Sequence, residues 1–304
     1  MQDLRIYTRL EVLLELRESG RHIHWSPSYR PAGILSGNHA SKLRGSGLNF
    51  EELRQYQFGD NIRQIDPRTS ARLKKPYVRV YSEETDRPVH LVIDQRLPMF
   101  FGSVEKTKSV IAAELAALLA WVALDSGDRV GGVVVGVNGI QPISPQRSAN
   151  NVITLLEAII SANNQLSLVT DAEPSGSLFA QVKPFLSSLT NQSVVILITD
   201  IEGLGETDIS ELEMLQHKSN FVLFVVQDPL EANLSLAHGL SISEGKEQIN
   251  IQVNNDNQQK YDALYQDKLQ QLTLAMSGSS LPLGLLNTHD PVVNQLMMLL
   301  QGHE

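Results

Sequence analysis

The stretch VHLVIDQRLPMF, residues 89–100, decides how the fold is interpreted, because a predicted strand in it runs directly into an acidic residue, Asp94. Three later stretches, RVGGVVV (129–135), VVILIT (194–199) and FVLFVV (221–226), are nearly continuous apolar runs. Such runs are typical of strands that are covered on both faces of a sheet.

Helical patterns separate these strands, at residues 103–125 and at about 148–163, 177–189 and 208–218. This alternation predicts an α/β fold with a doubly wound, mostly parallel sheet and helices on both faces. YVRVY (77–81) alternates as an edge strand does.

The sequence predicts that the chain has three parts. Residues 1–76 hold a helix at 3–18, an irregular loop at 22–47, a helix FEELRQY after Asn49, and a short helix begun by Asp66 and Pro67. Asn49 and Glu52 have the spacing of a helix start, and proline fits the first helical position. Residues 77–235 form the α/β domain. Residues 236–304 add a hairpin, an amphipathic helix and a short helix that pack on the same core.

The composition argues against several classes of protein. The 304 residues include no cysteine, which excludes disulfides and cysteine-ligated metal centres. VIAAELAALLAWVAL (110–124) has 15 residues and contains Glu114, so it is too short to span a membrane and predicts a buried helix. The first twenty residues mix both charges, unlike a secretory signal, so we expect a cytoplasmic protein.

The net charge of −9 is unevenly distributed. Residues 21–79 contain 11 Lys or Arg against 4 Asp or Glu, whereas residues 80–304 contain 11 against 26. This asymmetry predicts two regions that have different roles or that attract one another.

Three predicted strands end in an acid, at Asp94, Asp200 and Asp228. Ligands of open α/β sheets bind beyond the carboxyl ends of the strands. A von Willebrand factor A domain holds Mg²⁺ there with an Asp-x-Ser-x-Ser loop and a second Asp, because Mg²⁺ requires oxygen ligands. Asp94 and Asp200 match the two acidic positions, but Arg96 and Pro98 occupy the two serine positions.

Arginine and proline change the expected chemistry, because neither side chain offers an oxygen ligand and arginine is always cationic. We therefore predict a degenerate metal-ion-dependent adhesion site, with no metal or cofactor, in which Arg96 pairs with Asp94 or Asp200. An intact Mg²⁺ site and a simple capping role remain the alternatives. For Asp228, which precedes Pro229, capping is the favoured interpretation.

Residues 43–94 resemble the signature block of the domain of unknown function family 58, bacterial proteins associated with MoxR-type AAA+ ATPases. GDRVGG (127–132) also fits the family. The resemblance implies a von Willebrand A-like fold, partnership with an ATPase and no established catalytic chemistry. Pro67 replaces a common Trp, and the membrane helices that precede the block in many relatives are not seen here. The residues that carry the resemblance are Gly45, Gly47, Phe50, Glu52, Arg54, Tyr56, Gly59, Asp60, Arg63, Ile65, Asp66, Ala71 and Arg72.

The arginines of this block allow more than one interpretation. Arg54, Arg63 and Arg72 are predicted to pair with Glu52, Asp60 and Asp66, since guanidinium binds carboxylates with two parallel hydrogen bonds. Docking on an acidic partner is a second use for the basic block at residues 42–79. Nucleic-acid binding is less favoured, because acids are interleaved and no recognised nucleic-acid motif is present.

The sequence therefore predicts a non-enzymatic interaction module that works with a MoxR-type ATPase on client proteins, with Asp94, Arg96 and Asp200 on a binding rim. One alternative is a Mg²⁺-dependent phosphoester hydrolase at Asp94 and Asp200. The other is nonspecific nucleic-acid binding through residues 42–79.

Overall fold

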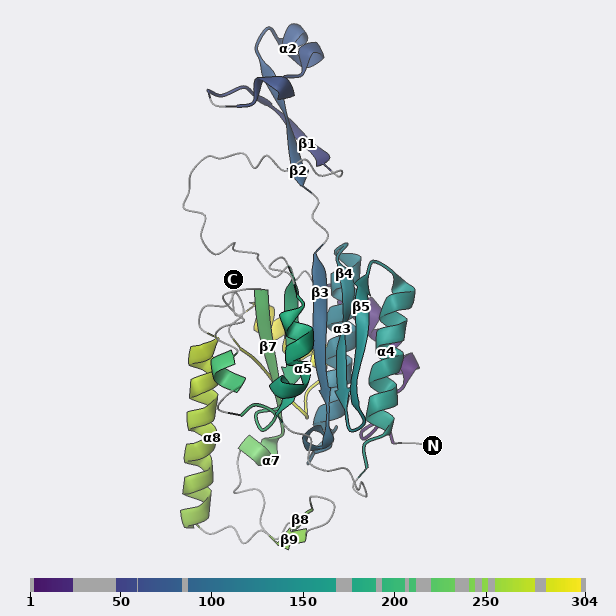
Figure 1. The fold of residues 1–304 in the computed structure, drawn as a ribbon, viewed down its shortest axis with the longest axis vertical. Helices are drawn as coiled ribbons and strands as arrows, with labels where there is room; N and C mark the ends of the chain where they lie inside the picture. The colour runs from purple at the N-terminus through teal and green to yellow at the C-terminus, as the bar shows by residue number, and fades with distance from the viewer. Residues whose placement is uncertain are drawn as a thin grey trace. The chain divides into compact units, whose positions relative to one another are not determined.

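The structure is a computed structural model that divides into two compact units (Figure 1). The main unit comprises Met1–Ala32 and Arg87–Glu304, and the small unit comprises Gly33–Asp86. The structure describes residues 3–23, 48–58, 60–83, 87–167, 177–189, 193–205, 208–211, 220–232, 241–243, 248–250, 255–276 and 283–301.

The described strands of the main unit form a six-stranded sheet in the order β10-β7-β6-β3-β4-β5. Neighbouring strands are parallel except β4 and β5, which are antiparallel. This topology confirms the predicted doubly wound, von Willebrand A-like α/β fold. The strands are β3 (Pro88–Gln95), β4 (Arg129–Gly136), β5 (Gly139–Gln146), β6 (Val194–Thr199), β7 (Asn220–Gln227) and β10 (Gly284–Asn287).

Helices cover both faces of this sheet, as the apolar strands require. One core packs Leu91 and Ile93 of β3 against α1 (Leu10–Gly20), α3 (Lys108–Asp125), α4 (Ala149–Asn164) and α9 (Val292–Gln301). The other packs Val92 of β3 against α5 (Leu178–Ser187) and α8 (Asn255–Ala275). Alternate side chains of a strand point to opposite faces, so a strand covered on both faces must be apolar throughout.

Helix α3 is the buried centre of the main unit. Its residues from Lys108 to Ala123 are all buried, which confirms that the apolar stretch at 110–124 is a core helix. A helix that is apolar around its circumference is stable only when neighbours enclose it. Among the described residues, none of the helices combines the length and the apolar character needed to cross a membrane.

Both ends of the main unit differ in part from the sequence prediction. Helix α1 begins at Leu10 and not at residue 3, because the Thr8 amide donates to Asn163 Oδ1 at 2.9 Å and holds the preceding segment in place. The predicted C-terminal hairpin is confirmed as β8 (Ser241–Ser243) paired with β9 (Gln248–Asn250). Strand β10 was not predicted; it has only four residues, too few to show a period.

The small unit contains the largest correction. The stretch FEELRQY was predicted as a helix, but residues up to Gln55 belong to strand β1 (Leu48–Gln55), which pairs antiparallel with β2 (Tyr77–Glu83). Pairing between strands overrides a local helix-start signal. Strand β2, predicted at the edge of the main sheet, therefore lies in the small unit, and the expected boundary at 76/77 falls inside that unit.

The rest of the small unit follows the prediction more closely. Asp66 accepts a hydrogen bond from the Thr69 amide at 2.7 Å and so caps α2 (Pro67–Leu73), as its position before Pro67 predicts. A short 3₁₀ helix, η1 (Ile62–Gln64), precedes it. Residues 24–47, which include most of the predicted irregular loop, lie outside the described part.

His90 on β3 should make the stability of the main unit depend on pH. The ring is 7% exposed and packs edge-on against Phe185, and its burial, followed by the charge of Arg129, lowers its pKa from 6.5 to about 4. Between these values the unfolded chain binds a proton that the folded chain does not, so stability falls with falling pH. At about pH 5 the loss from this group is about 2 kcal/mol relative to neutral pH.

The measurement is urea denaturation of the wild type and of His90→Leu between pH 6.5 and about pH 4, the two pKa values of this group. We expect the difference in unfolding free energy between the two proteins to change in favour of the variant as the pH falls. Parallel pH profiles for the two proteins would contradict the assignment.

Candidate functional site

The site lies where the strand order of the sheet reverses. Strand β3 is followed by β4 on one side, and the chain later returns to place β6 on its other side. The pairing of Ile93 with Ile198 brings the carboxyl ends of both strands together, with Asp94 and Asp200 at those ends. Both side chains have 0% exposure. The topology thus brings together the two acids that the sequence singled out.

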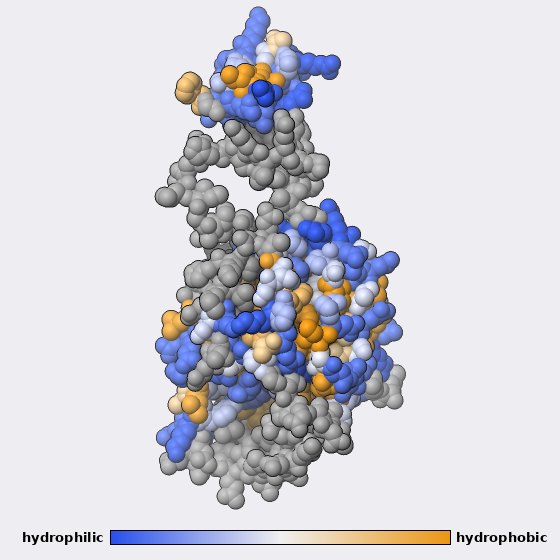
Figure 2. All heavy atoms as spheres, viewed as in Figure 1, coloured by the Kyte–Doolittle hydropathy of each residue, from blue (hydrophilic) through white to orange (hydrophobic). Residues whose placement is uncertain are grey.

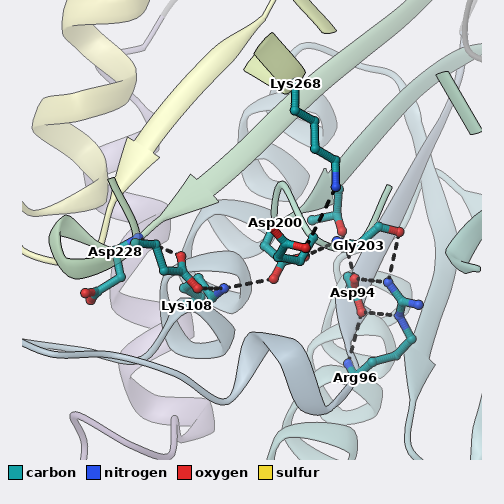
Figure 3. A network of polar contacts seen from close by, with 10 residues as sticks. Asp94, Arg96, Lys108, Asp200, Gly203, Asp228 and Lys268 are labelled. Carbon is teal, nitrogen blue, oxygen red and sulfur yellow. Dashed lines mark hydrogen bonds and ion pairs between the residues drawn. The ribbon is translucent and has the colours of Figure 1, made fainter. Parts of the chain in front are cut away.

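Asp94 is held by Arg96, as the sequence predicted (Figure 3). The guanidinium donates from Nε to Asp94 Oδ1 at 2.9 Å and from Nη2 to Asp94 Oδ2 at 2.8 Å. The Arg96 amide also donates to Oδ1 at 3.0 Å, and Thr199 Oγ1 donates to Oδ2 at 2.7 Å. Both oxygens of this carboxylate are therefore occupied by donors from the chain itself.

Asp200 is paired with a second cation, Lys108, which the sequence analysis missed (Figure 3). Lys108 is the first residue of α3, and its Nζ lies 2.8 Å from Asp200 Oδ2. The same ammonium donates to Glu231 in α7 (Pro229–Ala232). The other oxygen of Asp200, Oδ1, accepts from the Gly203 amide. One signal pointed to Lys108: it is a cation at the start of a helix that is otherwise mostly apolar.

The electrostatics keep both cations charged. Burial alone would lower the pKa of Lys108, but the charges of Asp200 and Glu231 reverse this and raise it to about 12. Burial likewise opposes the charged form of Arg96, yet hydrogen bonds and charge from Asp94 raise its pKa above the usual value. Burial raises the pKa of Glu231, with Lys108 acting against it. A metal ion at these acids would have to displace two buried cations.

Gly203 completes the enclosure of the two acids. Its carbonyl accepts from Arg96 Nη2 at 3.3 Å. A Cβ atom here would lie 2.3 Å from Thr199 Oγ1, 2.8 Å from Asp200 Oδ1 and 3.0 Å from Arg96 Nη2. The loop after β6 therefore needs glycine to bring its backbone onto the ion pairs.

Asp228, the third acid at a strand end, has the capping role that the sequence favoured. It accepts from the Leu230 amide at 2.9 Å at the start of α7. It also accepts from the Ser103 amide at 2.8 Å and from Thr288 Oγ1 at 2.6 Å. Burial would raise the pKa of Asp228, but these hydrogen bonds outweigh it and the net shift is downward. Asp228 thus joins three segments at the rim of the sheet.

Burial changes the role expected of the rim residues. Arg96 has 3% exposure, and Asp94 and Asp200 have none, so these side chains do not form the binding surface that the sequence predicted. Pro98 is exposed in the 3₁₀ helix η2 (Leu97–Met99). The described residues hold no group of three or more His, Cys, Asp or Glu side chains placed to bind a metal ion.

Of the three arginines that were predicted to pair with Glu52, Asp60 and Asp66, the described residues show only Arg54 paired with one of these acids. Arg54 binds Asp60 through two hydrogen bonds, at 2.7 and 3.0 Å. Asp66, however, pairs with Arg79 and not with Arg63 or Arg72. Hydrogen bonds from the Thr69 amide, and then from Arg79, lower the pKa of Asp66 to about 2.

The other residues of the signature block are only partly described. Arg63 and Arg72 are exposed, whereas Tyr56 is half-buried, and its amide donates to the Pro76 carbonyl at 2.9 Å. The described part of the chain does not include Gly45, Gly47 and Gly59, nor the side chains of Phe50 and Glu52.

A family model described as "Protein of unknown function DUF58" matches residues 52–271, most of the chain. The chain belongs to the DUF58 family. The match extends from β1 in the small unit to α8 in the main unit, so it includes most of the basic block and the paired acids.

Two mycobacterial relatives are similar to this DUF58 chain. They are the uncharacterized proteins Rv1480 of Mycobacterium tuberculosis and Mb1516 of Mycobacterium bovis. Each is 27% identical over 127 residues, which cover 42% of this chain and 40% of the relative. The match therefore spans less than half of either relative, and their names assign no function.

Removing either buried cation of the DUF58 site should destabilise the fold. Arg96→Met keeps much of the side-chain volume but leaves Asp94 charged and unpaired, which costs about 3–5 kcal/mol of unfolding free energy. Lys108→Met should cost a similar amount. Arg21→Met, which removes an exposed pair with Glu18, should change stability by less than about 1 kcal/mol. Chemical denaturation measures all three, and a cost for Arg96→Met no larger than for Arg21→Met would contradict the account.

Gly203 offers a second test of the same packing. Gly203→Ala places a methyl group against Thr199, Asp200 and Arg96, and we expect a loss of about 1–3 kcal/mol. Gly205→Ala is the matched control, because its nearest neighbour would be Asp208 Oδ2 at 3.5 Å, an ordinary contact. Equal melting temperatures for the two variants would show that the loop does not press on the ion pairs.

Proposed function

We propose that this DUF58 chain is a non-catalytic adaptor that works with a MoxR-type AAA+ ATPase in the assembly or maturation of client proteins, in the cytoplasm. The observation that carries the proposal is the occupation of Asp94 and Asp200 by Arg96 and Lys108. Membership of the DUF58 family and the resemblance of its signature block support the choice of partner.

The paired acids argue against chemistry at the rim. A metal-assisted hydrolase needs an ion with an open coordination position that substrate or water can reach. Here the oxygens of Asp94 accept hydrogen bonds from the chain, and neither acid is exposed. An adhesion domain of the ion-dependent kind also needs an open position, so it is equally disfavoured. The buried ion pairs serve the integrity of the fold and leave recognition to other surfaces.

The small unit provides such a surface. Between residues 53 and 79 the chain carries seven Lys or Arg and two Asp. Both aspartates are engaged, Asp60 by Arg54 and Asp66 by Arg79. The remaining positive charge favours an acidic partner and speeds its association.

The test mixes the purified full chain with a purified MoxR-type ATPase from the same source, with and without nucleotide, at low salt. We expect a complex in sedimentation velocity, and no complex with an unrelated AAA+ ATPase as the control. No complex under any of these conditions would contradict the proposal. So would turnover of phosphate esters that requires Mg²⁺ and is lost in Asp200→Asn.

A further inference from the structure

We propose that the small unit docks on a partner protein through an apolar anchor, Phe58 and Ile62, set among exposed cations, and that the partner offers an apolar pocket bordered by carboxylates. The proposal rests on the proposed function and specifies the chemistry of the partner. It assigns the contact to the loop between β1 and α2 and to α2 itself.

The two side chains of the anchor are unusually exposed to solvent. Phe58 is fully exposed and Ile62 is 70% exposed, four residues apart in the same loop. Leu53 and Leu73 of this unit are also exposed. Single exposed apolar residues are common, whereas an apolar patch bordered by polar residues marks an interaction surface. Figure 2 shows hydrophobic side chains bordered by hydrophilic ones on the visible face of this unit.

Hydrogen bonds hold the described residues on both sides of the anchor. Asp60 accepts two hydrogen bonds from Arg54 and one from the Gln57 amide at 2.8 Å. The Asp60 amide donates back to the Gln57 carbonyl at 3.0 Å, and Asn61 Oδ1 accepts from the Arg63 amide at 3.1 Å. A loop ordered in the free protein loses less entropy when it binds, which favours its use as an anchor.

The exposed cations lie on the anchor loop and on α2 or directly after it. Among the described residues none of them forms an ion pair, in contrast to Arg54 and Arg79. Arg68 and Arg72 are four residues apart on α2 and so share one side of it. The left-handed conformation of Lys74 ends α2 and begins the turn into β2. The exposed cations are Arg63, Arg68, Arg72, Lys74 and Lys75.

The mixture of groups favours a protein partner over a nucleic acid. Single-stranded nucleic acids are bound by cations together with aromatic rings that stack on bases. The exposed apolar residues here are mainly aliphatic, namely Ile62, Leu53 and Leu73, which fill pockets and do not stack. The surplus of cations complements a carboxylate-rich surface.

The experiment measures binding of the full chain to the ATPase of the proposed function, by biolayer interferometry at low and high salt. Phe58→Ala should weaken binding roughly tenfold or more, as expected for a central anchor. Arg68→Glu combined with Arg72→Glu should weaken it similarly and reduce its salt dependence. Matched controls on α8 are Leu264→Ala, at an exposed leucine, and Lys260→Glu, at an exposed lysine. All variants change exposed side chains, and circular dichroism is used to check that each is folded.

The outcomes separate this proposal from the proposed function. If the wild type binds the ATPase and all four variants bind equally well, the docking surface is wrong and the adaptor function stands. If the wild type does not bind, the same variants are tested on a labelled helical peptide of Glu, Ala and Leu. The surface is supported if the wild type binds this acidic peptide, Phe58→Ala does not, and neither binds a control peptide of Lys, Ala and Leu. Equal binding of both peptides overturns the surface.

The same experiments also test two other binding partners for the docking surface, DNA and a second copy of this chain. Tighter binding of random double-stranded DNA than of either protein probe, unchanged in Phe58→Ala, overturns the proposal in favour of nucleic acid. If the wild type sediments as a dimer at low salt and the variant with both Arg68→Glu and Arg72→Glu does not, the proposed partner is wrong. The acidic part of a second copy of this chain then binds the docking surface.

Discussion

The ion pairs of Arg96 with Asp94 and of Lys108 with Asp200 are the constraint on which the rest of the main unit depends. Two carboxylates at the ends of neighbouring buried strands cannot remain charged in an apolar interior without partners. A protein can neutralise such carboxylates with a bound divalent ion or with cationic side chains of its own. This chain supplies a guanidinium two residues after the first acid and an ammonium at the start of the central helix. Charge balance at the rim is therefore part of folding.

This arrangement ties the acids to the loops and helices around them. Lys108 joins the start of α3 to the end of β6 and to Glu231 in α7, and Asp228 joins α7 to Ser103 and to Thr288 after β10. The segments that would form a ligand site in an open α/β sheet are instead bonded to one another. The rim is a structural joint, and the docking surface that we propose lies in the small unit.

The sequence predicted the parts of the fold that a local pattern controls. Strands β6 and β7 are continuous apolar runs and α3 is apolar on all sides, so burial leaves few alternatives. The pair of Asp94 with Arg96 was predictable because the two residues are close in sequence and replace a familiar pattern. The pair of Asp200 with Lys108 joins residues 92 positions apart, so the position of Lys108 at the start of an apolar helix does not show which acid it pairs with. In β1, the helix-start signal of Asn49 and Glu52 misled because β2, its strand partner, follows only after α2.

The central claim is that side-chain cations hold the place of a metal ion at Asp94 and Asp200. The most direct measurement is an anomalous difference map from crystals grown in millimolar MnCl₂. The account predicts no manganese peak at either acid, with the Arg96 guanidinium on Asp94 and the Lys108 ammonium on Asp200. A manganese ion bound by both carboxylates, with Arg96 turned away, would contradict it.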